Sequence, residues 1–117
     1  MISYENNNNL LYYNKFSYHK NGSFNTVENY SASNVLNSKT IFDNQGREDL
    51  SEQYLNGKLI AKEEYDKGLK QKTTSYNRNG KIEQTQKYIY NDQGVLLKIQ
   101  IFSASGKLLD EQEKNEY

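Results

Sequence analysis

The side chains that could perform catalysis are few, and their spacing does not suggest a catalytic group. His19 is the only histidine of the 117 residues, and cysteine is absent. A general base needs a partner that positions it, and no acid or nucleophile stands at a matching spacing from His19. Because His19 comes just before Asn21 and Gly22, a typical turn pair, we interpret it as a solvated turn residue.

The carboxylates fall mainly in turn segments (Asp43, Asp66 and Asp92) or in stretches of mixed charge (Glu63 and Glu64). A hydrolase that uses two carboxylates, as glycosidases do, is therefore only an alternative, and it predicts loss of activity on single Asp or Glu changes. The sequence contains no phosphate-binding loop, dinucleotide fingerprint or metal-ligand spacing. We predict no catalytic residue, no cofactor site, no metal site and no enzymatic activity.

Composition favours a folded protein with a thin core. Only 34% of the residues are hydrophobic, but aromatic residues reach 13% and include eleven tyrosines. Disordered chains are also poor in hydrophobic residues, yet they usually lack aromatic ones. At 117 residues the chain has the size of a single domain.

Charge and hydropathy indicate which partners and compartments to expect. Fifteen basic and fifteen acidic residues give a net charge of zero, and no stretch forms a basic stripe. Nucleic-acid binding normally needs such a stripe, so we predict no direct nucleic-acid contact. No apolar run, residues 95–97 included, is long enough to cross a membrane, and residues 1–5 do not resemble a signal peptide. Without cysteine there are no disulfides, so we expect a cytoplasmic protein without membrane association.

A turn residue recurs at intervals of 11 to 14 residues. The turn positions are Gly22, Asn34, Gly46, Gly57, Gly68, Gly80, Gly94 and Gly106. Asn34 takes the place of a glycine, because residues 30–36 (YSASNVL) match residues 102–108 (FSASGKL). Asparagine is, after glycine, the residue that best tolerates a left-handed backbone. The period therefore extends through residue 34.

A period of this length suits one strand and one tight turn. The sequence predicts an all-β fold, an antiparallel meander of about eight or nine strands in a single-layer twisted sheet or an array of β-hairpin repeats. The domain would span residues 1–117, with an irregular N-terminal cap (1–17), regular repeats (18–106) and a terminal strand or short helix (107–117). Tyr4 and a turn at Asn8 would fit a further, degraded unit.

The alternation of side chains along a strand predicts an aromatic ladder. The second and eighth residues after each turn residue are mostly apolar, and we expect them on one face of the sheet. The eighth residue of one strand would then lie beside the second of the next. The ladder comprises Tyr30, Phe42, Tyr54, Tyr65, Tyr76, Tyr88, Tyr90 and Phe102. We interpret it as the core of a thin sheet, and alternatively as a recognition surface, since tyrosine supplies rigid contact area.

One predicted strand, residues 95–102, is apolar on both faces, which marks a surface that something should cover. A terminal segment (residues 10–13 or the tail 107–117), a second copy of the chain or a partner could do so. The candidate protein interface consists of Val95, Leu97, Ile99, Ile101, Tyr12 and Tyr13.

The unit Y-x-x-x-G-K-L-x-x-x-x-x-Y, seen in residues 76–88 (YNRNGKIEQTQKY) and 102–112 (FSASGKLLDEQ), resembles the MORN-variant repeats of the YwqK-like bacterial antitoxin family. The resemblance covers residues 18–114 and implies a string of β-hairpins that neutralises a toxin. The stretches FDNQGR (42–47) and YDKG (65–68) show a second, weaker resemblance to the YD repeats of Rhs-type shells.

From these patterns we expect a non-enzymatic protein-binding module, an antitoxin- or immunity-like inhibitor that masks a toxin or effector enzyme. One alternative is a phage or mobile-element inhibitor of a host defence nuclease. Another is a structural surface-repeat protein that self-associates. The expected partner is a protein (a toxin, an effector or a nuclease), with homodimerisation as a further alternative.

Overall fold

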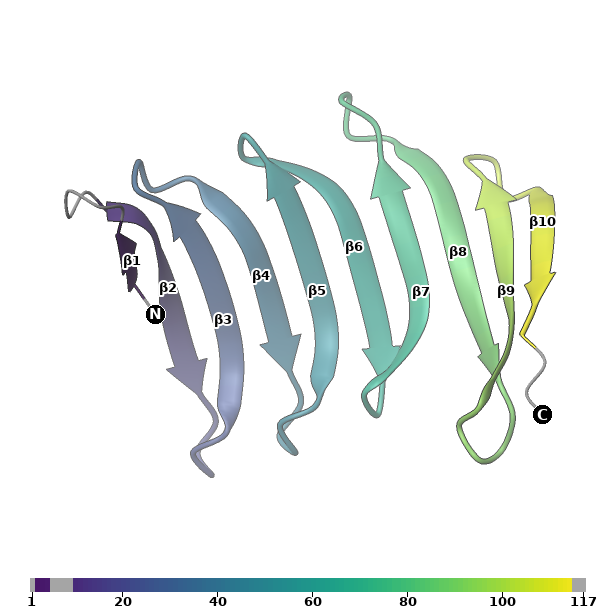
Figure 1. Cartoon of the computed structure of the whole chain (residues 1–117), viewed down its shortest axis with the longest axis horizontal. Helices are drawn as coiled ribbons and strands as arrows, with labels where there is room; N and C mark the ends of the chain where they lie inside the picture. Colours follow the sequence, from purple (N-terminus) through teal and green to yellow (C-terminus); the bar gives the residue numbers. More distant parts are fainter. Residues whose placement is uncertain (1, 5–9, 115–117) are drawn as a thin grey trace.

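A computed structural model of the chain describes residues 2–4 and 10–114. These residues form one sheet of ten antiparallel strands, in which each strand pairs with its neighbours in the sequence (Figure 1). The strands are β1 (Ile2–Tyr4), β2 (Leu10–Tyr18), β3 (Phe24–Ser31), β4 (Leu36–Phe42), β5 (Glu48–Leu55), β6 (Lys58–Asp66), β7 (Leu69–Tyr76), β8 (Ile82–Tyr90), β9 (Leu96–Ser103) and β10 (Leu108–Glu113). The predicted all-β, single-layer meander is confirmed.

Both ends of the chain add strands to the predicted repeats. The described part of residues 1–17, expected to be irregular, instead forms β1 and β2. The tail, predicted as a strand or a short helix, contributes strand β10. The proposed turn at Asn8 lies outside the described residues. Nowhere in residues 2–4 and 10–114 is there a helix with the length and apolarity that crossing a membrane requires.

The turn positions have the backbone that the sequence predicted. Asn34 has a φ of 67°, and the seven turn glycines have φ values between 80° and 90°. In the longer turns a side chain closes the loop. The carbonyl oxygen of the Asn77 side chain, for example, accepts hydrogen bonds from the backbone N–H groups of Asn79 and Lys81. Turn chemistry therefore sets the length of each repeat.

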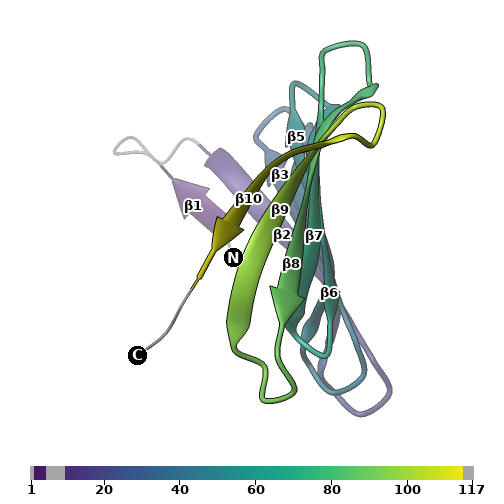
Figure 2. The ribbon, with the colours of Figure 1, turned by 90° about the vertical axis from the view of Figure 1, so that its right-hand side faces the viewer.

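Every hairpin between β2 and β10 contains a β-bulge three residues after its turn residue. Tyr54 pairs with Leu59 and Gln53 pairs with Ala61, so Ile60 has no cross-strand partner. The equivalent skipped residues are Asn25, Asn37, Asp49, Gln71, Glu83, Leu97 and Leu109. Bulges increase the local twist. The strands at the two ends of the sheet accordingly cross each other in the side view (Figure 2).

These bulges divide the aromatic ladder between the two faces of the sheet. Cross-strand partners share a face, and successive residues alternate, so an extra residue puts the second and eighth positions of one strand on opposite faces. We call the face with Lys15 and Glu28 face A, and the face with Asn14 and Asn29 face B. Face A carries Tyr30, Tyr54, Tyr76 and Phe102, whereas face B carries Phe42, Tyr65, Tyr88 and Tyr90. The prediction of a ladder on one face is wrong.

Within residues 2–4 and 10–114, neither face of the sheet is covered by a second layer. Among the described residues no hydrophobic side chain is buried, and the buried side chains are Ser51 and Thr74, one on each face. The radius of gyration is 17.1 Å, whereas a compact chain of this length has one of roughly 13 Å. The accessible surface is 8125 Å², compared with roughly 6,600 Å² for a compact monomer of this mass.

Candidate protein interface

The structure does not bring the predicted interface residues together. Tyr12 and Tyr13 are neighbours in β2 and point to opposite faces, and six strands separate β2 from β9. The Tyr13 ring stacks on Tyr30 with centroids 5.3 Å apart, and its hydroxyl donates a hydrogen bond to the Asn34 side chain. Tyr13 therefore joins neighbouring strands, while Tyr12 remains exposed on face B.

The apolar strand β9 lies open on both faces. Val95 and Leu97 are 40% and 42% exposed, and Ile99 and Ile101 are half-buried beside their β8 partners on face B. Strand β10 pairs with β9 in the plane of the sheet. Strand β2 lies near the other end of the sheet, far from β9 (Figure 1). Of the alternatives for covering β9, the terminal segments therefore do not serve as a cover in the described residues.

Face B carries a second apolar cluster that the sequence analysis missed. Phe24 stacks on Phe16 and on Tyr18, with centroid distances of 5.4 Å and 5.5 Å, and lies 6.0 Å from Phe42. Phe16, Tyr18 and Phe24 are all exposed. The sequence signal was available, because Phe16 shares strand parity with Tyr18, and Phe24 follows the Gly22 turn.

Face A is organised by charge over its first half. Opposite charges alternate along a row of successive cross-strand partners from β2 to β6. The row consists of Lys15, Glu28, Lys39, Glu52 and Lys62. The Lys39 ammonium lies 3.9 Å from the Glu28 carboxylate. Opposite charges in cross-strand positions stabilise a sheet by roughly 0.2–1 kcal/mol per pair. This row helps to explain how the sheet is maintained without a buried apolar core.

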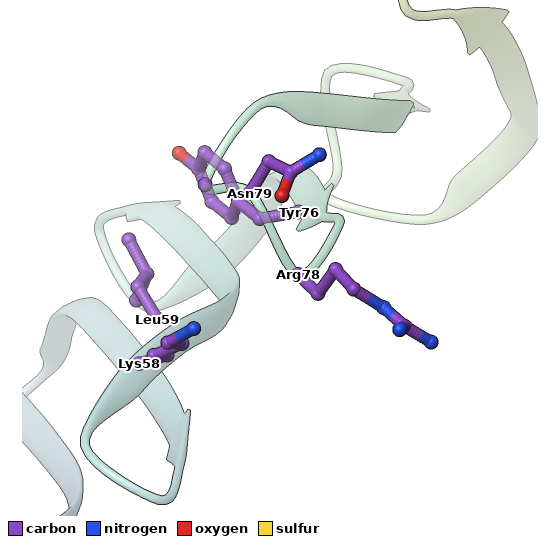
Figure 3. Close-up of a pocket in the computed structure, with 6 residues that line it drawn as sticks. Lys58, Leu59, Tyr76, Arg78 and Asn79 are labelled. Atoms are coloured by element: carbon purple, nitrogen blue, oxygen red, sulfur yellow. The ribbon is translucent and has the colours of Figure 1, made fainter.

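A shallow recess of about 500 Å³ lies between two hairpin tips on face A. Leu59 at the start of β6 and Tyr76 at the end of β7 line it, together with Lys58 and Asn79. In Figure 3 the side chain of Arg78 extends away from Leu59 and Tyr76. The recess therefore combines an aliphatic wall with an aromatic one.

A second recess of about 320 Å³ lies at the next pair of hairpin tips. It is lined by Ile82, Lys72, Lys87 and Phe102, and the Lys87 ammonium lies 5.1 Å from the centroid of the Phe102 ring. Tyr76 and Ile82, which are cross-strand partners, stand between the two recesses. A recess with apolar walls thus occurs twice along these hairpin tips of face A, and the second recess also carries two lysines.

The shifted pKa values on face B belong to groups that keep their protons at neutral pH. Burial raises the pKa of the Tyr65 hydroxyl, and the nearby Glu63 and Glu48 carboxylates raise it further. The Lys70 ammonium donates a hydrogen bond of 2.6 Å to Glu63, and this bond raises the pKa of Lys70. Both groups hold neighbouring strands together.

His19 joins two hairpin tips, the β2–β3 turn and the end of β4, on the side of the sheet opposite the two recesses. Its Nε2 atom lies 3.0 Å from the backbone carbonyl oxygen of Phe42, at hydrogen-bonding distance. The side chain is half-buried, so the turn residue is less solvated than predicted. In the part of the chain that the structure describes, no three His, Asp or Glu side chains converge into a metal site.

The chain matches no family model and no curated protein. The structure of accessory secretory protein 1, 2 and 3 from Streptococcus pneumoniae is similar, with a TM-score of 0.52 and 13% identity over 77% of this chain and 18% of that one. The GtfA/B complex bound to UDP and GlcNAc gives a TM-score of 0.47 and 20% identity over 82% and 21% of the two chains. A protein of unknown function from Bacteroides fragilis gives a TM-score of 0.44 and 13% identity, over 94% of this chain and 96% of that one.

This chain spans about a fifth of the length of the first two of these similar chains, 18% and 21% respectively. At 13% identity, the likeness to the first of them shows the sheet fold alone.

Proposed function

We propose that this chain is a non-enzymatic protein-binding module that lays a face of its open sheet against another protein. The observation that carries this proposal is the absence of any buried hydrophobic side chain among the described residues, while fourteen large hydrophobic ones are exposed. The accessible surface exceeds that of a compact monomer by about 1,500 Å². A stable protein interface buries only about 800 Å² on each partner.

The chemistry of the surface favours a polypeptide partner. Exposed tyrosine and phenylalanine side chains lie among hydroxyl, amide and balanced charged groups, which is the composition of protein interfaces. Stacking of nucleic-acid bases on the same rings would require accompanying basic residues along the backbone path. The chain has a net charge of zero, which disfavours that alternative.

The specific form that we propose is an antitoxin- or immunity-like inhibitor that masks a toxin or effector enzyme in the cytoplasm. The repeat resemblance of residues 18–114 supports this form, and the lack of cysteine suits a reducing compartment. An inhibitor of a host defence nuclease, carried by a phage or mobile element, would use the same surface. The identity of the bound partner separates the two.

Self-association is the second candidate function. Among the described residues, β1 and β10 are the outermost strands of the sheet, and an unpaired edge is a template for another strand. This alternative predicts concentration-dependent growth without a specific partner. Sedimentation velocity over a wide concentration range would detect it.

The experiment that tests the proposed function is affinity capture from the native cell at physiological salt, followed by mass spectrometry. The proposal predicts one specific protein, held with nanomolar affinity and released by an excess of the untagged chain. Circular dichroism of the tagged chain controls for correct folding. Recovery of no specific protein by a folded bait would refute the proposal.

A further inference from the structure

Lys72 of β7 and Lys87 of β8 occupy directly opposed positions on face A. Like charges in such positions destabilise a sheet. The Lys72 ammonium lies 3.8 Å from the Glu64 carboxylate, whereas the salt bridges among the described residues provide no such partner for Lys87. Because Lys15 and Lys39 face Glu28 in the same sheet, the pair at β7 and β8 is a local departure from the charge pattern. Departures of this kind are expected at functional sites.

The lysine pair lies beside the two recesses at the hairpin tips. We call the combined face A lining of the two recesses the tip groove, which consists of Leu59, Tyr76, Lys72, Ile82, Lys87 and Phe102. The two recesses are two strands apart, and strands are spaced about 4.8 Å apart, so their centres are separated by roughly 10 Å. Each recess has apolar walls, and the lysine pair lines the second one.

We propose that the tip groove binds an extended acidic segment of the partner protein. Two apolar side chains of this segment fill the two recesses, and its carboxylates contact the ammonium groups of Lys72 and Lys87. The carboxylates would relieve the repulsion between Lys72 and Lys87, so binding removes a cost that the free chain carries. This inference rests on the proposed function and adds the chemistry of the segment that the partner must present.

The observations favour an acidic polypeptide over a nucleic acid. The Glu64 carboxylate beside Lys72 would repel a phosphate backbone, and the alternating row from Lys15 to Lys62 does not continue the positive charge across face A. A nucleic acid needs a continuous series of basic contacts. A short acidic segment matches the groove in two ways. Its carboxylates can lie at the lysines, and its apolar side chains can fill the recesses.

The inference can be tested with synthetic probes. The first probe is a fluorescein-labelled peptide of Phe-Glu-Glu repeats, whose phenylalanines lie on one side, roughly 9 Å apart, when the peptide adopts the extended polyproline II conformation with three residues per turn. Matched probes replace every Glu with Lys, or every Phe with Ser, and an oligothymidylate serves as the nucleic-acid probe. Fluorescence anisotropy should show binding of the first peptide and weaker binding of the other three. Equal binding of the Lys peptide or of the oligothymidylate would overturn the inference.

Two matched double variants locate the site. Changing Lys72→Gln together with Lys87→Gln should weaken binding of the Phe-Glu-Glu peptide by about tenfold. Changing Lys15→Gln together with Lys39→Gln removes the same charge from the same face, and it should leave the affinity within about twofold. Circular dichroism confirms the fold of both variants. Unchanged affinity of a folded Lys72/Lys87 variant would contradict the inference.

Capture experiments separate this inference from the proposed function. If the Lys72/Lys87 variant still retains the native partner as wild type does, the partner binds elsewhere and only the tip groove is refuted as its site. If the folded wild-type chain captures no native protein, the proposed function fails whatever the peptide result. Loss of the partner from the Lys72/Lys87 variant alone supports both.

Discussion

Tyr54 and Leu59 are cross-strand partners on face A, one residue beyond the bulge at Ile60. The same relationship recurs at the hairpin tips on this side of the sheet, in the pairs Tyr30 with Leu36, Tyr76 with Ile82, and Phe102 with Leu108. At the hairpin tips on the opposite side, the equivalent pairs lie on face B. The structural repeat is therefore a two-strand hairpin, although the sequence repeats once per strand.

The division of the ladder between two faces can be tested by double-mutant cycles. Tyr54→Ala and Leu59→Ala should show a coupling energy of roughly 0.2–1 kcal/mol in urea unfolding, because the two side chains touch across the strands. Tyr54→Ala and Tyr65→Ala should be additive, because these rings lie on opposite faces at opposite edges. A larger coupling for Tyr54 with Tyr65 than with Leu59 would show that our face assignment is wrong.

The turn register predicts a contrast between neighbouring substitutions. Gly80 has a φ of +80°, so Gly80→Val should lower the free energy of unfolding by roughly 1–3 kcal/mol through backbone strain. Lys81→Thr should change it by less than about 0.5 kcal/mol. Gly80→Asn should fall between them, because Asn34 already adopts a left-handed backbone at an equivalent position. Equal stabilities of the Val and Thr variants, measured by urea unfolding, would refute the register.

The sheet should lose stability at alkaline pH. Burial raises the pKa values of Tyr54, Tyr65 and Tyr90 above the ordinary value of 10.0, and the hydrogen bond to Glu63 raises the pKa of Lys70 above 10.5. A raised pKa in the folded state gives stability that is complete below the unfolded pKa and is lost as the pH rises through the folded one. The free energy of unfolding should therefore decline above about pH 10.

Urea titrations at a series of alkaline pH values measure this decline. Tyr65→Phe removes one of the ionising groups and should flatten the pH dependence. An identical slope in wild type and the Tyr65→Phe variant would exclude Tyr65 as a contributor.

The Asp43 carboxylate should contribute to the free energy of unfolding at neutral pH and lose this contribution at acidic pH. The backbone N–H of Arg47 and then that of Gln45 donate to its carboxylate, and these bonds hold the pKa of Asp43 below 3.8. The stability from this lowered pKa is present above the unfolded pKa and is lost as the pH falls through the folded one. Asp43→Asn should preserve the turn at neutral pH, as Asn77 does in its own turn, and should reduce the acid sensitivity. An unchanged acid profile of the variant would contradict this account.

The sequence predicted the turns well because a positive φ restricts residue type strongly. Asn34 could be recognised in a glycine position for this reason, and its φ of 67° confirms it. The bulges could not be predicted in the same way. The skipped residues include Asn25, Ile60 and Leu97, which share no property, because a bulge restricts backbone pairing more than side-chain type. The missed bulges led directly to the wrong assignment of faces.

The candidate site was predicted only in part. Val95 and Leu97 are exposed, whereas Ile99 and Ile101 are half-buried. The opposition of Lys72 and Lys87 depends on the register between β7 and β8, and a shift of one residue would put one lysine on face B. The tip groove therefore becomes visible only in the structure.

If both proposals hold, the partner protein covers face A of this open sheet at the tip groove. Hydroxyl-radical footprinting of the chain, free and bound to its captured partner, would detect this coverage directly. We predict that Tyr76, Ile82 and Phe102 react several-fold more slowly in the complex, while Tyr18 and Phe24 on face B react as in the free chain. Unchanged reactivity of the tip-groove residues in the complex, or protection of the face B residues instead, would contradict the claim.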